Sequence, residues 1–182
     1  MRDLGEMAGL ITDLLESERL AGRHAALHRE PTDVAELARE VVADLCSRNA
    51  GAADIALHTA PDLPAVRLDR SRLRLLLRNL LDNSLRHSES GAFPPELHLR
   101  LVDEGRVLEL EVRDHGRGVP PEHLPPLAQA FYRPDTARQR ATGGVGLGLY
   151  LCRLVAQAHD GQLNMRNAEP GLSVTVRLPV VE

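Results

Sequence analysis

The sequence predicts an α+β fold, a two-layer sandwich in which helices cover one face of a mixed β-sheet, with a separate helix at the N-terminus. Two observations favour this class. Segments that alternate apolar and polar residues are joined as a hairpin, and segments with helical spacing lie before and after that hairpin. A length of 182 residues allows one or two small domains.

The first expected element is an amphipathic helix over residues 3–21. Its apolar residues recur three or four positions apart: Leu4, Met7, Ile11 and Leu14. This stripe is typical of a helix that packs against a partner, and packing on the helix's own domain explains it equally well. Residues 22–32 follow as a connector.

A second helix is predicted from Asp33 to about Ser47. Asp33 is its N-cap, and Glu36, three residues later, completes a capping box. Two short strands are expected next, over 55–59 and 65–68, where apolar residues are bounded by prolines.

A leucine-rich helix follows over 73–86, with Asp69 or Ser71 at its start. The hairpin comes next, because residues 97–102 and 107–113 alternate apolar and polar side chains around a short polar turn. These two strands are expected to pair as neighbours in the sheet.

The last third of the chain opens with a loop over roughly 115–144, whose length indicates a functional segment rather than a tight joint. A helix is expected from about 145 to 159. Two strands, 162–166 and 172–178, then complete the sheet.

Composition excludes several classes of enzyme. All 22 residues counted as Lys+Arg are arginine. Without lysine, a P-loop, a eukaryotic-type protein kinase and a Schiff-base enzyme each lack a residue that their chemistry requires. Any phosphate contact must therefore use arginine, histidine, a metal or backbone N–H groups.

Net charge and cysteine content limit the possible partners and the cellular location of the chain. A net charge of −4 does not favour a nucleic-acid partner. Cys46 and Cys152 form no C-x-x-C pair, so neither a zinc site nor a disulfide framework is indicated. No apolar run reaches the ~18 residues that span a bilayer. We therefore expect a cytoplasmic chain that makes no membrane contact of its own.

The first candidate motif is a polar face on the leucine-rich helix. Its members recur three or four residues apart and share that face: Asn79, Asn83, Arg86 and His87. An amide oxygen is a good ligand for Mg²⁺, and a neighbouring guanidinium suits a phosphate. An ordinary solvated helix face is the alternative interpretation.

The second candidate motif runs from Asp114 to Pro120, directly after the hairpin. A carboxylate at the end of a strand can accept a hydrogen bond from the exocyclic amine of a purine. Gly116 and Gly118 would let the backbone approach the ring closely. A simple Asp-x-Gly turn explains the same residues.

The third candidate motif opens the last predicted helix. It is rich in glycine: Gly143, Gly144, Gly146 and Gly148. Backbone N–H groups at a helix N-terminus attract phosphate oxygens. No strand immediately precedes these glycines, so the dinucleotide-binding fingerprint fails its context, and a flexible hinge is the alternative.

In this order, the motifs resemble those of the ATP-binding catalytic domain of bacterial sensor histidine kinases. That domain has the Bergerat-type fold of the gyrase, chaperone, kinase and mismatch-repair ATPase group. Residues 79–87 are similar to the N box, 114–120 to the G1 box and 143–149 to the G2 box. Residues 127–133 resemble the F box, and the resemblance covers about residues 30–180.

The resemblance implies that the chain binds ATP and Mg²⁺. Asp114 would accept from the adenine N6 amine, and Asn83, assisted by Asn79, would hold Mg²⁺ and act in catalysis. The remaining nucleotide contacts would come from the four boxes: Arg86, His87, Gly116, Gly118, Phe131, Tyr132, Arg133, Gly144, Gly146, Leu147 and Gly148. Residues 125–142 would form an ATP lid that is mobile without nucleotide.

The resemblance also implies two domains. Residues 1–27 would be the second helix of a dimerisation and phosphoacceptor hairpin, and residues 31–182 the ATP-binding catalytic domain. The γ-phosphoryl group would pass to a histidine on a dimerisation helix and then to an aspartate of a response regulator. A homodimer through residues 4–15 is a further expectation.

The acceptor histidine is expected outside this chain. None of the eight histidines lies in a His-Glu or His-Asp pair on a helix of the required kind. We therefore expect the chain to be a fragment of a membrane-anchored kinase that does not phosphorylate itself when alone.

Four residues depart from what the family usually carries. Arg86 stands where lysine is frequent and His87 where tyrosine is frequent, and both can still donate to phosphate. Ala128 replaces a common phenylalanine of the F box, which would loosen the lid. Val145 replaces a common hydroxyl residue, which removes one phosphate donor.

Two other functions of the same fold are ATP-hydrolysing switches and anti-sigma-factor-type serine kinases. The hydrolysing enzymes carry glutamate four residues before the metal-binding asparagine. That position is Asn79 here, and an amide cannot take a proton from water. The F box and the N-terminal helix favour a histidine kinase over a serine kinase, and intact Asn83 and Asp114 argue against a decayed, non-catalytic pocket.

Overall fold

The computed structural model describes residues 26–48, 55–88, 93–134 and 146–180, with positions 12, 14, 15, 18 and 19. Those five isolated positions are helical, in agreement with the expected N-terminal helix. The other elements are, in chain order, β1 (Glu30–Thr32), α2 (Val34–Arg48), β2 (Ala56–Thr59), β3 (Val66–Leu68), α3 (Arg70–His87), β4 (Glu96–Val102), β5 (Val107–Arg113), η1 (Pro121–His123), α4 (Gly148–Ala158), β6 (Gln162–Asn167) and β7 (Leu172–Pro179).

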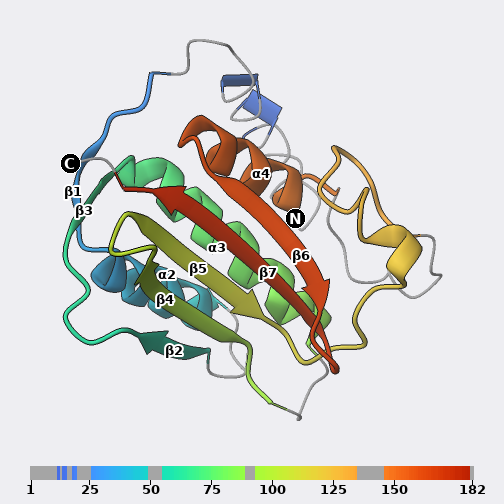
Figure 1. Ribbon diagram of the computed structural model, residues 1–182. Helices are drawn as coiled ribbons and strands as arrows, with labels where there is room; N and C mark the ends of the chain where they lie inside the picture. The colour runs from blue at the N-terminus through green and yellow to red at the C-terminus, as the bar shows by residue number, and fades with distance from the viewer. Residues whose placement is uncertain are drawn as a thin grey trace.

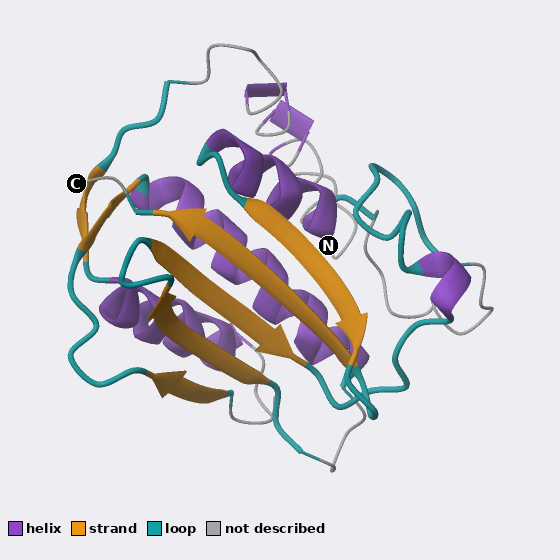
Figure 2. Ribbon diagram, viewed as in Figure 1, coloured by secondary structure: helices purple, strands orange, loops and turns teal. Residues whose placement is uncertain are grey.

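The main sheet has five strands in the order β2-β4-β5-β7-β6. β2 runs parallel to β4, and the other neighbours are antiparallel, so the sheet is mixed. Helices α2, α3 and α4 cover one face, and the opposite face carries none of the described helices (Figure 1, Figure 2). The α+β sandwich that the sequence predicts is confirmed.

The core lies between the helices and the sheet and consists mainly of leucine and valine. α3 contributes a row of buried leucines that are at most 1% exposed: Leu73, Leu76, Leu77, Leu80 and Leu81. Alternate residues of β5 are buried as well: Leu108, Leu110 and Val112. Truncating a buried leucine to alanine costs about 2–5 kcal/mol. This packing therefore holds the polar face of α3 in a fixed position over the sheet.

Helix starts follow the predicted caps with one exception. Asp33 Oδ1 accepts from Glu36 N at 2.8 Å, and Asp69 Oδ1 accepts from Arg72 N at 3.1 Å, so both aspartates are N-caps. The last helix begins at Gly148 rather than near residue 145, and Gly146 just before it has a left-handed φ of 78°.

One strand lies where a connector was expected. Residues 30–32 form β1, which pairs antiparallel with 66–68 in a separate two-stranded sheet. Pro31 lies within this strand, although proline has no backbone N–H to donate. The strand tolerates it because β1 pairs with β3 alone in this two-stranded sheet. Within the described ranges, no helix is long and apolar enough to cross a membrane.

Candidate functional site

The three predicted motifs meet at one end of the sheet. A Cβ atom added to Gly116, after β5, would lie 2.2 Å from the carbonyl oxygen of His87, the last residue of α3. A Cβ atom added to Gly148, the first residue of α4, would lie 3.5 Å from Asn79 Oδ1. The C-terminal ends of β5 and α3 lie together in Figure 1. The fold thus brings together segments that are far apart in the sequence.

Asp114 is a buried carboxylate that the backbone holds in place. It is 4% exposed, and its Oδ1 accepts from Gly116 N at 2.9 Å and from Leu172 N at 3.1 Å. Its own N–H donates to Leu172 O at 3.0 Å. Within the described ranges, no hydrogen bond is made to its Oδ2. One oxygen is therefore fixed by protein donors, and the other can accept from a ligand.

Two residues beyond the predicted motifs shape this region. Gly171 has a φ of 94°, and a Cβ atom there would lie 1.8 Å from the carbonyl oxygen of Asp114. Asn167, at the end of β6, accepts from Val119 N at 2.9 Å and donates to Val119 O at 2.7 Å. The sequence offered only weak signals for them, an asparagine after a strand and a glycine before one.

The polar face of α3 places its four residues in two environments. Asn79 and Asn83 are half-buried, whereas Arg86 and His87 are exposed. Asn79 Nδ2 donates to Leu75 O at 3.0 Å, which orients its amide along the helix. Arg86 Nε donates to Asp82 Oδ2 at 2.9 Å. The helix therefore offers amide oxygens nearer the core and a cation further out.

The charge of His87 depends on its neighbours at this end of the sheet. Partial burial of the ring lowers the pKa of His87, and the positive charges of Arg86 and Arg133 lower it further, although Asp114 opposes them. The residue as a whole is still exposed, so water reaches part of it. A lowered pKa favours the neutral imidazole near pH 7, which can donate one hydrogen bond.

The F-box and G2-box residues lie in contact. Phe131 N donates to Gly146 O at 3.0 Å, and a Cβ atom at Gly146 would lie 2.8 Å from Tyr132 O. The Tyr132 hydroxyl bonds to the His123 ring, and Phe131 is 59% exposed. Leu147 is buried at the start of α4. Gly144 and the lid residues 135–142 lie outside the described residues, so their predicted contacts stay predictions.

His159 is the one histidine that stands directly before an aspartate, and it is fully buried. Its Nε2 accepts from Asp69 N at 3.2 Å, and its Nδ1 donates to Val155 O at 2.9 Å. Both ring nitrogens are thus engaged inside the protein. This histidine is therefore not available as a phosphate acceptor in the folded chain.

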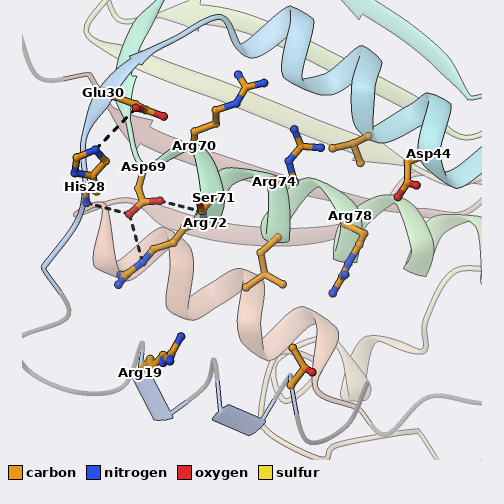
Figure 3. Close-up of a pocket in the computed structure, with 13 residues that line it drawn as sticks. Arg19, His28, Glu30, Asp44, Asp69, Arg70, Ser71, Arg72, Arg74 and Arg78 are labelled. Carbon is orange, nitrogen blue, oxygen red and sulfur yellow. Dashed lines mark hydrogen bonds and ion pairs between the residues drawn. The ribbon is translucent and has the colours of Figure 1, made fainter. Parts of the chain in front are cut away.

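A charged cleft of about 790 Å³ lies elsewhere, beside α2 and α3 (Figure 3). Arg70, Arg74 and Arg78 of α3 line it together with Asp44 of α2. Arg70 and Arg74 both pair with Glu40 of α2. None of the predicted nucleotide residues lines this cleft, so it is distinct from the site around Asp114.

Comparison with known proteins identifies a family and related sequences. A family model described as "Histidine kinase-, DNA gyrase B-, and HSP90-like ATPase" matches residues 68–182. The sensor histidine kinase YkoH of Bacillus subtilis is 40% identical over 129 residues, which are 71% of this chain and 27% of YkoH. The signal transduction histidine-protein kinase BaeS of Escherichia coli is 31% identical over 179 residues, 98% of this chain and 38% of BaeS.

Two solved structures have the same fold. Full-length ShkA in complex with AMPPNP aligns with a TM-score of 0.84 and 26% identity, covering 99% of this chain and 37% of ShkA. The mycobacterial sensor histidine kinase MprB aligns with a TM-score of 0.70 and 26% identity, covering 84% of this chain and 97% of that structure. The chain spans less than two fifths of the curated relatives YkoH and BaeS, at 27% and 38% of their length.

Proposed function

Because this chain belongs to the family of histidine kinase-, DNA gyrase B- and HSP90-like ATPases, we propose that it is the ATP-binding catalytic domain of a sensor histidine kinase. It binds Mg-ATP and catalyses transfer of the γ-phosphoryl group to a histidine outside this sequence, for relay to an aspartate of a response regulator. Its similarity to YkoH and BaeS, both named as histidine kinases, supports this proposal.

The observation that carries the proposal is the environment of Asp114. A buried carboxylate with one oxygen bound to two backbone N–H groups keeps the other oxygen in a fixed position. An exocyclic amine on a flat ring suits such an acceptor, because Gly116 adds no side chain between the carboxylate and the end of α3. Asp114 is therefore the residue that would recognise adenine.

The polar face of α3 fits a hydrated magnesium ion. Mg²⁺ takes few protein ligands and prefers oxygen, and the half-buried amides of Asn83 and Asn79 supply oxygen atoms. Asn79 uses its N–H₂ group on Leu75 O, which leaves its carbonyl oxygen for a ligand. When bound, Mg²⁺ neutralises charge on the phosphate oxygens. Asn83 would be the main ligand and Asn79 the second.

Contacts to the phosphates would come from two sides. Arg86 supplies a permanent positive charge, and His87 donates as a neutral imidazole because its pKa is lowered. The other phosphate contacts would come from backbone N–H groups of the glycine-rich segment that leads into α4: Gly144, Gly146, Leu147 and Gly148. In the transfer, a nitrogen of the acceptor imidazole bonds to the γ-phosphorus as the bond to ADP breaks. Asn79 provides no base to activate water, so transfer is favoured over hydrolysis.

The rest of the proposal concerns partners and placement. Residues 1–27 would belong to the dimerisation hairpin and residues 31–182 to the catalytic domain, in the cytoplasm. Leu14 and Leu15 are 49% and 59% exposed, which supports a partner helix and a homodimer through residues 4–15. Sedimentation tests this part, since a chain that remains monomeric at high concentration would contradict the dimer.

Transfer in trans tests the function. The chain is mixed with a separate dimerisation hairpin that carries its histidine, and with labelled Mg-ATP. We expect acid-labile phosphohistidine on the hairpin and none on the chain alone. Asn83→Ala should abolish transfer and Mg²⁺-dependent ATP binding while the fold persists. Asn164→Ala, an exposed position on β6, is the matched control and should transfer like the parent. Equal transfer by both variants would overturn the assignment of Asn83.

A further inference from the structure

Two histidines and a glutamate gather on the helix-free face of the sheet, at the β2 edge. β2 pairs in parallel with β4, and His58 stands directly opposite His98 in the register. Glu96 precedes His98 by two residues on the same strand, so the three side chains leave the same face. Leu97 and Leu99, between and after them, are buried beneath the helices. The group is therefore separate from the core and is distinct from the residues assigned to the nucleotide.

The three side chains are close enough to share an ion. One ligand atom from each of His58, Glu96 and His98 lies within 4.8 Å of the others. His98 Nε2 is 2.9 Å from Glu96 Oε2, and the two imidazole rings stack with their centroids 4.5 Å apart. His58 is exposed, so its ring can leave the stacked position without disturbing packed residues. A ring nitrogen of His58 can then point at an ion shared with Glu96 and His98.

The glutamate is held by a residue from the loop that follows β5. His115 Nε2 lies 2.9 Å from Glu96 Oε1, and the His115 side chain is only 10% exposed. This leaves Oε2 directed at His98. Carboxylates and imidazoles that ligate metals characteristically have such a partner on their second polar atom, because it fixes the ligand's orientation. His115 is therefore a positioning residue for the cluster.

We propose that His58, His98 and Glu96 bind a divalent transition-metal ion of the Zn²⁺ class, with water completing the coordination. Two imidazoles and a carboxylate suit Zn²⁺, whereas Mg²⁺ and Ca²⁺ prefer ligand sets made of oxygen alone. At Zn–N and Zn–O distances near 2.1 Å, tetrahedral ligands lie about 3.4 Å apart. The His98–Glu96 pair at 2.9 Å would widen by only about 0.5 Å when an ion replaces the shared proton.

A bound ion would join an edge strand to the sheet. β2 has four residues and pairs only with β4 among the described strands. Ligands from both strands would link them across their hydrogen bonds. Because the folded chain would bind the ion and the unfolded chain would lack the assembled site, Zn²⁺ should raise the melting temperature.

The test uses the tag-free chain in chelator-treated buffer without nucleotide, titrated with Zn²⁺ against a chromophoric competitor. We expect one Zn²⁺ per chain and, with Co²⁺ as a probe, the visible absorption of a tetrahedral site. His58→Ala and Glu96→Gln should each weaken binding at least about 100-fold, and His115→Ala about 10–100-fold.

The matched control is His28→Ala, which removes an exposed imidazole beside a glutamate, Glu30, at 3.9 Å, outside the cluster. It should bind Zn²⁺ as the parent does. Melting curves without metal establish that each variant is folded. Absence of stoichiometric binding by the parent, or equal binding by His58→Ala and the parent, would overturn the proposal. Neither result depends on ATP, so the proposed kinase function stands or falls separately.

Discussion

The side chain of Asn167 pairs with the backbone of Val119 in both directions. Its Oδ1 accepts from Val119 N at 2.9 Å, and its Nδ2 donates to Val119 O at 2.7 Å. Val119 lies in the loop that follows Asp114, whereas Asn167 ends β6 at the far edge of the sheet. The loop of the proposed adenine site is thus held by a strand that lies two positions away from β5.

Asn167→Ala should weaken both the fold and nucleotide binding. Both polar groups of Val119 lose their partner, which we expect to lower the free energy of unfolding by about 1–3 kcal/mol. The loop that carries Gly118 loses its support, so ATP affinity should fall too. Chemical denaturation and nucleotide titration measure the two effects. Asn164→Ala on the same strand is the control, and an Asn167→Ala variant with the ATP affinity of this control would contradict the prediction.

Alanine variants at Gly171 and Gly105 distinguish the cost of backbone strain from the cost of a steric clash. Both have positive φ, 94° and 84°, but a Cβ atom at Gly171 would meet the Asp114 carbonyl, whereas one at Gly105 has nothing within 4 Å. Gly105→Ala should therefore cost only the strain of a left-handed alanine, about 1–2 kcal/mol. Gly171→Ala should cost roughly 1–3 kcal/mol more.

Nucleotide binding should distinguish the same two variants. Gly171→Ala must displace Asp114, so ATP affinity should drop, whereas Gly105→Ala lies in the β4–β5 turn and should bind like the parent. Denaturation curves and ATP titrations of the pair are the measurements. Equal losses of stability, together with equal affinities, would show that Asp114 does not depend on the close approach of Gly171.

The part of the site on α3 could be predicted because its signal is local. Asn79 and Asn83 are one helical turn apart, and the helix is fixed by leucines that are contiguous with them in the sequence. Asp114 was predictable for the same reason, since it follows directly after an alternating strand. In these cases a short stretch of sequence determines both the element and the position of the residue in it.

Contacts between segments that lie far apart in the sequence could not be predicted in this way. Leu172 N binds Asp114 Oδ1 across 58 residues of sequence, and the Asn167–Val119 pair spans 48. Both depend on β7 lying beside β5 and β6 beyond it, and this strand order leaves no periodic pattern in the sequence. β1 was missed likewise, because its short segment with Pro31 becomes a strand only through pairing with β3.

Arg86→Lys tests whether the arginine-only composition matters to the phosphate site. Arg86 Nε donates to Asp82 Oδ2 in an exposed i,i+4 pair. Such pairs contribute little, so the free energy of unfolding should change by less than about 0.5 kcal/mol. Lysine keeps the charge but lacks the planar fork, so ATP affinity should fall only a few-fold, and further in Arg86→Gln. Titrations at low and high salt measure this, and a lysine variant that binds like the parent would show that charge alone suffices.

The buried ring of His159 should make stability depend on pH. Burial lowers the pKa of His159. Its Nε2 accepts from the N–H of Asp69, the residue that caps α3. Protonation would turn that acceptor into a donor facing another donor. The unfolded chain binds this proton near the ordinary pKa of 6.5, and the folded chain resists it. Stability from this group is therefore complete above that pH and is lost as the pH falls below it.

His159→Gln should remove this part of the pH dependence. At pH 7.5 the variant should be about 1–3 kcal/mol less stable, because buried hydrogen bonds are lost. Between pH 7.5 and 5.5 its free energy of unfolding should then fall less steeply than that of the parent. Some slope remains, because the pKa of His87 is lowered as well. Glu109, whose pKa is lowered by Arg100 and Arg177 despite burial, contributes only at more acidic pH.

The control is His28→Gln, which removes an exposed ring instead. If the free energy of unfolding of His159→Gln falls with pH as steeply as that of this control, the buried imidazole does not set the acid sensitivity of the fold.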